Sequence, residues 1–351
     1  MKLLADASLP YVSELFKPAF DITFFHDNHT VATLLKDHDI LLCRSTLKVN
    51  HALIKQAKLK VVATASSGTD HINQQDLQRF NITLLDAKGC NARAVADYVL
   101  ACFAYLSQQH AFKTKTVGII GAGHVGCMVG SYFKTLGLKV YYYDPIRAYH
   151  DPSFENTSFE QILACEMICV HPNLHNDAFF PSRNLLNLSA LQQLKPNTAL
   201  INASRGHVVC ESALLALKTP LFYCTDVFAN EPYILDDIVK YATLCTPHIA
   251  GHTWQAKFNA QALLSQKLHA LYNLTAPNFS PVYPIKPINT DALWQNNVLA
   301  CYHPLLETNI LKAAADLKTA FIGLRQSHKR HDLERYFNKP LAKVFTEAEP
   351  P

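Results

Sequence analysis

Three polar side chains, each in a short loop after an apolar run, have the types that acid–base chemistry on a small acid requires. Arg205 follows I-N-A-S, Glu231 stands in D-V-F-A-N-E-P, and His248 stands in T-P-H-I-A-G. An imidazole can take a hydroxyl proton while hydride leaves the same carbon of a 2-hydroxy acid. A guanidinium can hold the carboxylate, and a carboxylate beside the imidazole fixes its tautomer and stabilises its charged form. We therefore assign the general base to His248, the group that holds the substrate carboxylate to Arg205, and the carboxylate that pairs with the imidazole to Glu231.

The chain contains 17 histidines, so one histidine alone would mean little. The set of three is stronger evidence, because each member lies in a loop marked by glycine or proline after a predicted strand. Those strands are Ala199–Asn202 and Leu221–Val227, and the helix Glu211–Leu217 is expected between them.

The segment Val117–Asp144 predicts a binding site for the cofactor that would receive the hydride. Val117–Ile120 reads as a strand, and the next apolar residues recur at steps of three and four, which indicates a helix. Gly137 stands where a helix C-cap belongs, and Val140–Tyr143 reads as a second strand. The order strand, glycine-rich turn, helix, strand is typical of a dinucleotide-binding unit.

The three glycines of this segment, Gly121, Gly123 and Gly126, have G-x-G-x-x-G spacing. The first permits a tight turn, the second lets a pyrophosphate approach the backbone, and the third lets helix and strand pack closely. Asp144 ends the second strand, where it can accept hydrogen bonds from a ribose and repel a 2′-phosphate, so we expect NAD rather than NADP. The expected cofactor contacts here are Gly121, Gly123, His124, Val125, Gly126 and Asp144.

Composition excludes several classes of protein. Of 351 residues, 49% are hydrophobic and 17% charged, which is ordinary for a globular chain with a large core. A net charge of +4 does not indicate nucleic-acid binding, and no signal sequence or membrane-spanning run is predicted. Ten cysteines without a secretory signal favour a reducing cytoplasm, and their spacing predicts no metal site.

Strand and helix signals alternate through most of the chain, which predicts parallel sheets with helices on both faces. Ligands of such sheets bind beyond the carboxyl ends of the strands. Two strand ends of the first 90 residues carry polar groups, Arg44 with Ser45 and the run that begins at Ser66, and these are candidates to hold an anion. The other possibility is that they are routine turn residues.

The C-terminal region differs from the rest. Four prolines between Ala276 and Pro287 indicate an extended linker, and beyond it one helix is expected at Leu311–Leu324. About sixty residues are few for an independent core, so we expect Leu311, Ala314, Ala315, Leu317 and Leu324 to pack on a second copy of the chain.

Together these motifs resemble the D-isomer-specific 2-hydroxyacid dehydrogenases. The first domain adds L-C-R-S-T-L-K-V-N and A-T-A-S-S-G-T-D-H, which are similar to a member that oxidises a small phosphorylated 2-hydroxy acid. The resemblance implies two doubly wound parallel-sheet α/β domains and a shortened α+β dimerisation segment. The expected bounds are 1–90 with 254–287 for a flavodoxin-like substrate-binding domain, 91–253 for a Rossmann NAD-binding domain, and 288–351 for the dimerisation segment.

The resemblance also implies site residues. It adds Pro172, Ala203, Ser204, Asp226 and Gly251 to the expected cofactor contacts, and Ser45 and Ser66 to the substrate contacts. His252 stands where the family has a tyrosine, and a histidine can still donate to a phosphate. Alternatives are a phosphoglycerate or glyoxylate/hydroxypyruvate type of dehydrogenase, or a non-catalytic NAD-sensing protein of the same fold.

Overall fold

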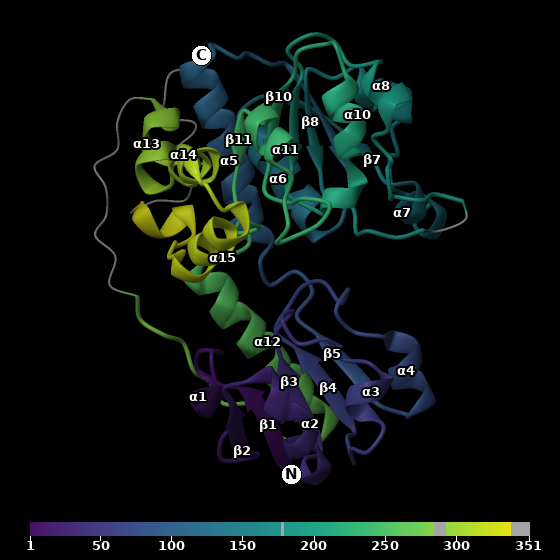
Figure 1. Ribbon diagram of the computed structural model, residues 1–351, viewed down its shortest axis with the longest axis vertical. Helices are drawn as coiled ribbons and strands as arrows, with labels where there is room; N and C mark the ends of the chain where they lie inside the picture. Colours follow the sequence, from purple (N-terminus) through teal and green to yellow (C-terminus); the bar gives the residue numbers. More distant parts are fainter. Residues whose placement is uncertain (177–178, 284–292, 338–351) are drawn as a thin grey trace. The chain divides into compact units, whose positions relative to one another are not determined.

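Two parallel β-sheets organise the chain, and each belongs to its own unit (Figure 1). The computed structural model describes residues 1–176, 179–283 and 293–337. The first unit comprises Met1–Asn91 and Thr253–Pro284, and the second comprises Ala92–His252 and Ile285–Pro351. The prediction of two α/β parallel-sheet domains is therefore confirmed.

The sheet of the first unit has the strand order β2-β1-β3-β4-β5, which is the flavodoxin-like order. Its strands are β1 Lys2–Asp6, β2 Asp21–Phe25, β3 Ile40–Cys43, β4 Val61–Thr64 and β5 Thr83–Asp86. The helical elements are α1 Val12–Phe16, η1 Asn28–Thr30, α2 Val31–Leu34, η2 Leu35–Asp37, α3 His51–Ile54, α4 Gln74–Arg79 and α12 Trp254–Leu271.

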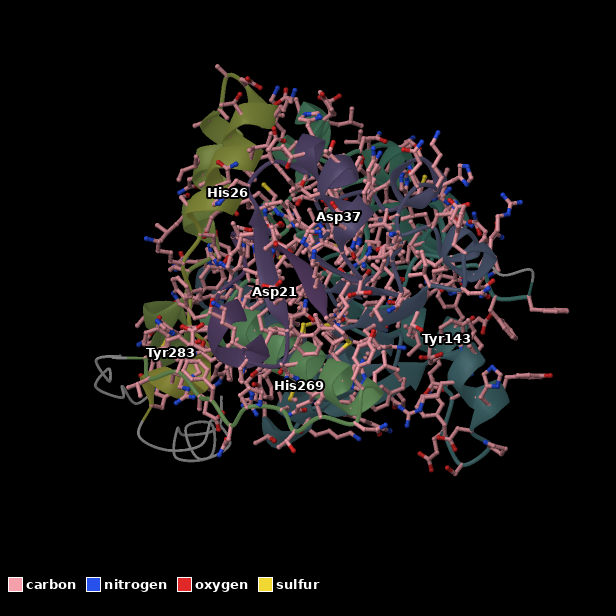
Figure 2. The ribbon with its side chains drawn as sticks, turned by 90° about the horizontal axis from the view of Figure 1, so that it is seen from below. Asp21, His26, Asp37, Tyr143, His269 and Tyr283 are labelled. Atoms are coloured by element: carbon pink, nitrogen blue, oxygen red, sulfur yellow. The ribbon has the colours of Figure 1, made fainter. Side chains whose placement is uncertain are left out.

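Side-chain alternation along these strands gives the sheet two buried faces. Leu3 packs with α1 and α12, whereas its neighbour Leu4 packs with α2, α3 and α4. On α12, His269 is buried with its ring 5.0 Å from that of Phe20, and Figure 2 labels it on that helix. Helices therefore cover both faces, and the carboxyl edge of the sheet is where polar side chains gather.

The sheet of the second unit has the order β11-β10-β9-β8-β6-β7. Its strands are β6 Thr116–Ile120, β7 Lys139–Tyr143, β8 Met167–Val170, β9 Ala199–Asn202, β10 Phe222–Thr225 and β11 Leu244–Cys245. Between or before them lie α5 Ala92–Gln109, α6 His124–Thr135, α7 Pro145–His150, α8 Phe159–Leu163, α9 Leu188–Leu191, η3 Gly206–Val208, α10 Glu211–Ala216 and α11 Asp236–Tyr241.

This order differs from the usual Rossmann sheet, which continues for one more strand beyond β7. At that edge the chain makes a single backbone hydrogen bond, from Thr157 N to Tyr142 O at 2.7 Å, instead of a strand. The chain passes from β6 to β7 on one side and then crosses to β8 on the other side of β6. The switch point of the sheet therefore lies between β6 and β8. Dinucleotides bind at such a crevice.

The described part of the C-terminal segment is helical and lies beside α5 (Figure 1). It contains α13 Trp294–Cys301, α14 Leu305–Ala313, α15 Leu317–Ser327 and η4 Leu333–Tyr336, with no strand among residues 293–337. The prediction of one helix over Leu311–Leu324 is wrong. Asp316 ends the break between two helices, because its carboxylate caps α15 by accepting from Thr319 N at 3.2 Å.

The expectation that this segment needs a second copy of the chain to bury its apolar side chains is also wrong. Leu311 is fully buried, and Leu317 and Leu324 pack against the same cluster, which covers one face of the second sheet. Trp294 and Val298 of α13 join the cluster on the other face with α5. The segment completes the core of the second unit.

The segment also covers the open edge of that sheet. β11 is the outermost strand, and Thr308 Oγ1 of α14 accepts a hydrogen bond from Cys245 N at 2.9 Å and lies 3.0 Å from Cys245 O. The N–H of the edge residue therefore has a side-chain partner on α14, and the Thr308 hydroxyl proton is shared between Cys245 O and Pro304 O, which lies 2.8 Å away. An unpaired edge is otherwise a template for pairing with another chain.

Candidate active site

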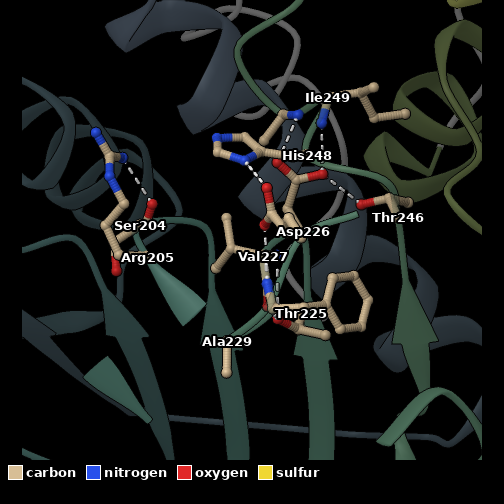
Figure 3. A network of polar contacts seen from close by, with 12 residues as sticks. Ser204, Arg205, Thr225, Asp226, Val227, Ala229, Thr246, His248 and Ile249 are labelled. Carbon is tan, nitrogen blue, oxygen red and sulfur yellow. Dashed lines mark hydrogen bonds and ion pairs between the residues drawn. The ribbon is translucent and has the colours of Figure 1, made fainter. Parts of the chain in front are cut away.

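Three neighbouring strands of the second sheet position the proposed catalytic side chains. Arg205, Glu231 and His248 follow β9, β10 and β11, which lie side by side and run in the same direction. Their loops therefore leave the sheet at one edge, as the sequence predicts. Figure 3 shows Arg205 and His248 above that edge.

The structure brings Glu231 and His248 into direct contact. His248 Nδ1 lies 2.6 Å from Glu231 Oε2, so the carboxylate accepts from the Nδ1–H tautomer and leaves Nε2 for other chemistry (Figure 3). His248 has φ +56°, a left-handed conformation that non-glycine residues adopt rarely. Its N–H donates to Asp226 O at 2.7 Å, which helps to hold that conformation.

The environment of Glu231 favours its charged form. Burial would raise the pKa of this carboxyl group, but the charge and hydrogen bond of His248 and a hydrogen bond from Phe228 N bring the pKa below its ordinary value. The Phe228 N–H donates to Oε1 at 2.9 Å, so both carboxylate oxygens have a partner. Glu231 can therefore accept from, and stabilise, a protonated imidazole.

Asp226 holds the loop that carries His248. Its Oδ1 accepts from Thr246 Oγ1 at 2.7 Å and from Ile249 N at 2.8 Å, and its Oδ2 accepts from Ala250 N at 2.8 Å. Asp226 is only 1% exposed, and burial raises its pKa in spite of the nearby His248 and these donors. The predicted role of Asp226 was a cofactor contact; in the structure its carboxylate is engaged by the chain.

Two further residues support this loop, and the sequence pattern did not indicate either. Tyr98 of α5 places its hydroxyl 2.9 Å from Thr246 Oγ1, so a helix about 150 positions earlier in the chain reaches the loop. Arg330 of the C-terminal segment donates through Nη2 to Ala250 O at 2.5 Å. Such long-range contacts leave no periodic signal in the sequence.

The turn after β9 positions the side chain and the backbone of Arg205. Its Nη1 donates to Ser204 O at 2.8 Å, and Figure 3 shows the guanidinium apart from the Glu231–His248 pair. Ser204 is buried, with its N–H and hydroxyl both donating to Asn202 Oδ1, while Asn202 Nδ2 donates to Arg205 O. Asn202 thus fixes the turn from within.

The three glycines of the dinucleotide motif differ in the space that a Cβ atom would have at each position. Gly121 has φ +86°, and a Cβ there would lie 2.6 Å from Pro172 N. At Gly126 a Cβ would lie 2.0 Å from Gly121 O, so this position requires close packing of helix and turn. At Gly123 a Cβ would meet no atom within 4 Å, which is the open approach that a pyrophosphate needs.

Asp144 braces the glycine-rich turn from the end of β7. Its Oδ2 accepts from Ala122 N at 2.9 Å, and its Oδ1 accepts from Arg147 N at 2.9 Å and so caps α7. Arg147 Nη1 donates to Ala122 O at 2.8 Å, and its guanidinium stacks 4.5 Å from the centroid of Phe154. These contacts tie Arg147 down, which leaves it poorly placed to receive a 2′-phosphate.

The remaining cofactor candidates follow β6, β8, β9 and β11 in the second sheet. His124 and Val125 begin α6, Pro172 follows β8 against Gly121, and Ala203 and Gly251 lie in the turns after β9 and β11. His171, which begins the run H-P-N-L but is not among the expected site residues, precedes Pro172. Neither ring nitrogen of His171 has a partner among the described residues, and burial lowers its pKa to about 3, so it is neutral.

In the first unit, Arg44 and Ser66 leave adjacent strands. Cys43 at the end of β3 pairs in register with Thr64 at the end of β4, so the loops that carry Arg44–Ser45 and Ser66 start together. Arg44 Nε donates to the buried carboxylate of Asp6 at 2.8 Å, and its Nη atoms have no partner among the described residues.

Lys257 of α12 is a cation that the sequence pattern did not indicate. Partial burial of its ammonium and, next, the charge of Arg44 lower its pKa. The first unit therefore contains two cations, Arg44 and Lys257, together with Ser45 and Ser66. The fourth candidate, His252, belongs to the second unit and donates its backbone N–H to Ile249 O at 2.8 Å.

Known proteins share both the motif and the fold. A family model described as D-isomer specific 2-hydroxyacid dehydrogenase, NAD binding domain, matches residues 104–250. The crystal structure of NAD⁺-bound 3-phosphoglycerate dehydrogenase of Entamoeba histolytica matches with a TM-score of 0.67 at 21% identity, over 78% of this chain and 95% of that one. These matches define the class of fold, which contains an NAD-binding domain.

Relatives define the family more narrowly. Erythronate-4-phosphate dehydrogenase of Legionella pneumophila (strain Lens) is 48% identical over 98% of this chain and 99% of the relative. The enzyme of the same name from Idiomarina loihiensis is 35% identical over 96% of this chain and 93% of the relative. The chain belongs to the D-isomer-specific 2-hydroxyacid dehydrogenases and, within them, to the erythronate-4-phosphate dehydrogenase family. Among the residues described, no helix combines the length and apolar character needed to cross a bilayer.

Proposed function

We propose that this protein oxidises 4-phospho-D-erythronate to (R)-3-hydroxy-2-oxo-4-phosphooxybutanoate with NAD, an early step of pyridoxal 5′-phosphate synthesis. The observation that carries the chemistry is the Glu231–His248 pair, 2.6 Å apart at the carboxyl edge of the second sheet. The choice of substrate is supported by full-length relatives named erythronate-4-phosphate dehydrogenase.

In the proposed reaction His248 Nε2 removes the proton from the C2 hydroxyl, and NAD, when bound, would accept the hydride from C2. Glu231, whose pKa is held below its ordinary value, stabilises the imidazolium that forms. Arg205 holds the substrate carboxylate and so orients C2. The open space at Gly123 and the N-terminus of α6 fit the pyrophosphate of NAD, and Asp144 fits its ribose.

We propose that Arg44, Ser45, Ser66 and Lys257 bind the substrate phosphate, with His252 as a further donor to the substrate. Asp6 fixes the guanidinium of Arg44 through Nε, which leaves its Nη groups available for an anion. Lys257 adds a second cation to the same unit, and burial and then the charge of Arg44 lower its pKa. Binding energy from the phosphate, which is remote from C2, can then be used to align the reacting carbon.

The test compares 4-phosphoerythronate with plain erythronate for wild type, Arg44→Ala and Arg79→Ala. Arg79 is an exposed arginine at the end of α4 and serves as the matched control. Arg44→Ala should lower kcat/KM about 10–100-fold for the phosphorylated substrate, a loss of about 1.5–3 kcal/mol, and little for the plain one. Equal losses on both substrates would show that Arg44 only pairs with Asp6 and would favour another 2-hydroxyacid dehydrogenase activity.

We further propose that the protein is a cytoplasmic homodimer. The cytoplasm is supported by ten free cysteines. The dimer is supported by Leu306 and Ile310, four positions apart on α14 and 66% and 51% exposed. Light scattering of Leu306→Glu/Ile310→Glu should give a monomer, whereas Leu215→Glu, at an exposed leucine of α10, should leave a dimer. A double variant that remains dimeric would place the interface elsewhere.

A further inference from the structure

A cavity in the C-terminal segment lies away from the residues assigned above to substrate and cofactor. It has a volume of about 390 Å³ and lies between the end of α13, the start of α14 and the residues that follow α15. Apolar side chains form part of the wall. The polar part consists mainly of Tyr302, His303, Glu307, His328 and Arg330.

Each of these five side chains has buried polar atoms without a partner among the described residues. The atoms are Tyr302 Oη, His303 Nδ1, Glu307 Oε2, His328 Nε2, and Nε and Nη1 of Arg330. Buried polar groups in folded proteins are nearly always hydrogen-bonded, and a cluster of exceptions around one cavity needs an explanation. An occupant that accepts hydrogen bonds could satisfy the donors among these atoms, which belong to Arg330, Tyr302 and His303.

The charges favour an anion as the occupant. Arg330 is 3% exposed, and within the described part of the chain its hydrogen bonds run from Nη2 to Ala94 O at 2.9 Å and to Ala250 O at 2.5 Å. The carboxylate of Glu307 pairs with His328 Nδ1 at 3.2 Å instead. A buried guanidinium normally has a hydrogen-bonded counter-ion. The charge of Arg330 acts on the buried carboxyl group of Asp97, but no described carboxylate accepts a hydrogen bond from this guanidinium.

A metal ion fits the cavity less well. In the part of the chain that the structure describes, no group of three or more His, Cys, Asp or Glu side chains is arranged to hold one. The guanidinium of Arg330, 4.5 Å from the centroid of the Tyr302 ring, would repel a cation. Donors outnumber acceptors at this wall, because Arg330 and Tyr302 present N–H and O–H groups and His303 can present another, whereas Glu307 Oε2 accepts and His328 Nε2 accepts when Nδ1 carries the proton.

We propose that this cavity is a second anion site, which binds a small carboxylate or phosphate, and that Arg330 links it to the loop of His248. The same guanidinium that would meet the anion holds Ala250 O, and Ala250 N in turn donates to Asp226. An anion that fixes Arg330 therefore also restrains the loop Thr246–Ala250. This site is separate from the substrate site and does not depend on which 2-hydroxy acid is oxidised.

The binding test uses inorganic phosphate and malonate as probes, with equilibrium dialysis of the whole protein. The Arg205→Gln background removes one expected anion contact of the active site. Arg330→Gln and His303→Ala should each weaken the binding of the cavity anion by about tenfold or more, as loss of a partner to a charged group does. Arg335→Gln, at an exposed arginine five positions away, should bind as wild type does. Binding of phosphate alone or of malonate alone identifies the chemical class, and either supports the proposal.

Two further measurements locate the site and its link. Crystals soaked in selenate should show an anomalous peak in the cavity beside Arg330. Hydrogen exchange of a peptide that covers the loop Thr246–Ala250 should slow when the probe is added, in wild type but not in His303→Ala. If Arg330→Gln fails to fold, His303→Ala decides. Unchanged binding in the cavity variants, or selenate density only at the active site, would overturn the proposal.

Discussion

At the scale of single residues, the pair Glu231–His248 determines the expected pH dependence. Glu231→Gln keeps the shape but removes the charge 2.6 Å from the imidazole. Without that charge the imidazolium is less stable, so the acid limb of the kcat/KM profile should move to lower pH while kcat falls. Glu211→Gln is the control, because Glu211 accepts from Ala229 N in the same loop without touching His248. A limb that moves equally in both variants would refute the pairing.

His248→Ala should reduce kcat by about 10²–10⁴-fold, the usual contribution of a general base. NAD binding should persist, because the glycine-rich turn and Asp144 lie at other strands of the sheet. Fluorescence titration with NADH measures binding apart from turnover. Loss of NADH binding in this variant would mean that His248 supports the fold of the cofactor site rather than the chemistry.

At the scale of elements, the glycine-rich turn offers a pair of matched substitutions. Gly121→Ala places a Cβ 2.6 Å from Pro172 N in a left-handed backbone, so it should cost about 1–3 kcal/mol of unfolding free energy. Gly123→Ala meets nothing within 4 Å and should leave stability nearly unchanged while it weakens NAD binding. Urea unfolding and NADH titration of both variants separate the two effects. Equal destabilisation by both would contradict the assigned roles.

The contact between α5 and the C-terminal segment should depend on pH. Asp97 of α5 accepts from Leu333 N at 2.8 Å and from the Tyr132 hydroxyl at 2.9 Å, and burial and the charge of Asp332 raise its pKa to about 7 from an unfolded value near 3.8. The folded protein therefore keeps the Asp97 proton up to a higher pH than the unfolded chain does. The stability that this proton contributes is lost as pH rises through about 7.

Asp97→Asn should flatten that dependence. Urea midpoints at pH 5.5 and 8, values chosen roughly to bracket the transition, should differ less in this variant than in wild type. Asp37→Asn, at an exposed aspartate, should keep the wild-type difference. A slope unchanged in Asp97→Asn would assign the proton to another group.

Local patterns predicted most elements, because their causes are local. Met167–Val170 and Ala199–Asn202 are apolar runs bounded by turn residues, and both strands have the predicted bounds. The helix over Leu311–Leu324 failed because the apolar spacing continues across Asp316, where a side-chain cap starts a new helix. Lys257 and Tyr98 were missed because their significance comes only from neighbours distant in sequence.

At the scale of the whole molecule, the C-terminal segment behaves as part of the core. A chain that stops after Pro287 loses Trp294, Val298 and Leu311 from two apolar clusters and the Thr308 side chain from the edge of β11. We expect it to aggregate and to bind a hydrophobic dye, rather than to remain a soluble monomer. Gel filtration and dye fluorescence measure both. A folded, dye-free monomer that binds NADH would show that the segment is dispensable.

The hydrogen bond from Arg330 to Ala250 joins residues 80 positions apart and has a consequence for biosynthesis. On the ribosome, Glu231 and His248 are both translated well before Arg330 exists. A nascent chain that ends before Arg330 therefore carries both catalytic residues but lacks this restraint on their loop. Protein fragments released early from translation would then carry the catalytic residues without the finished enzyme.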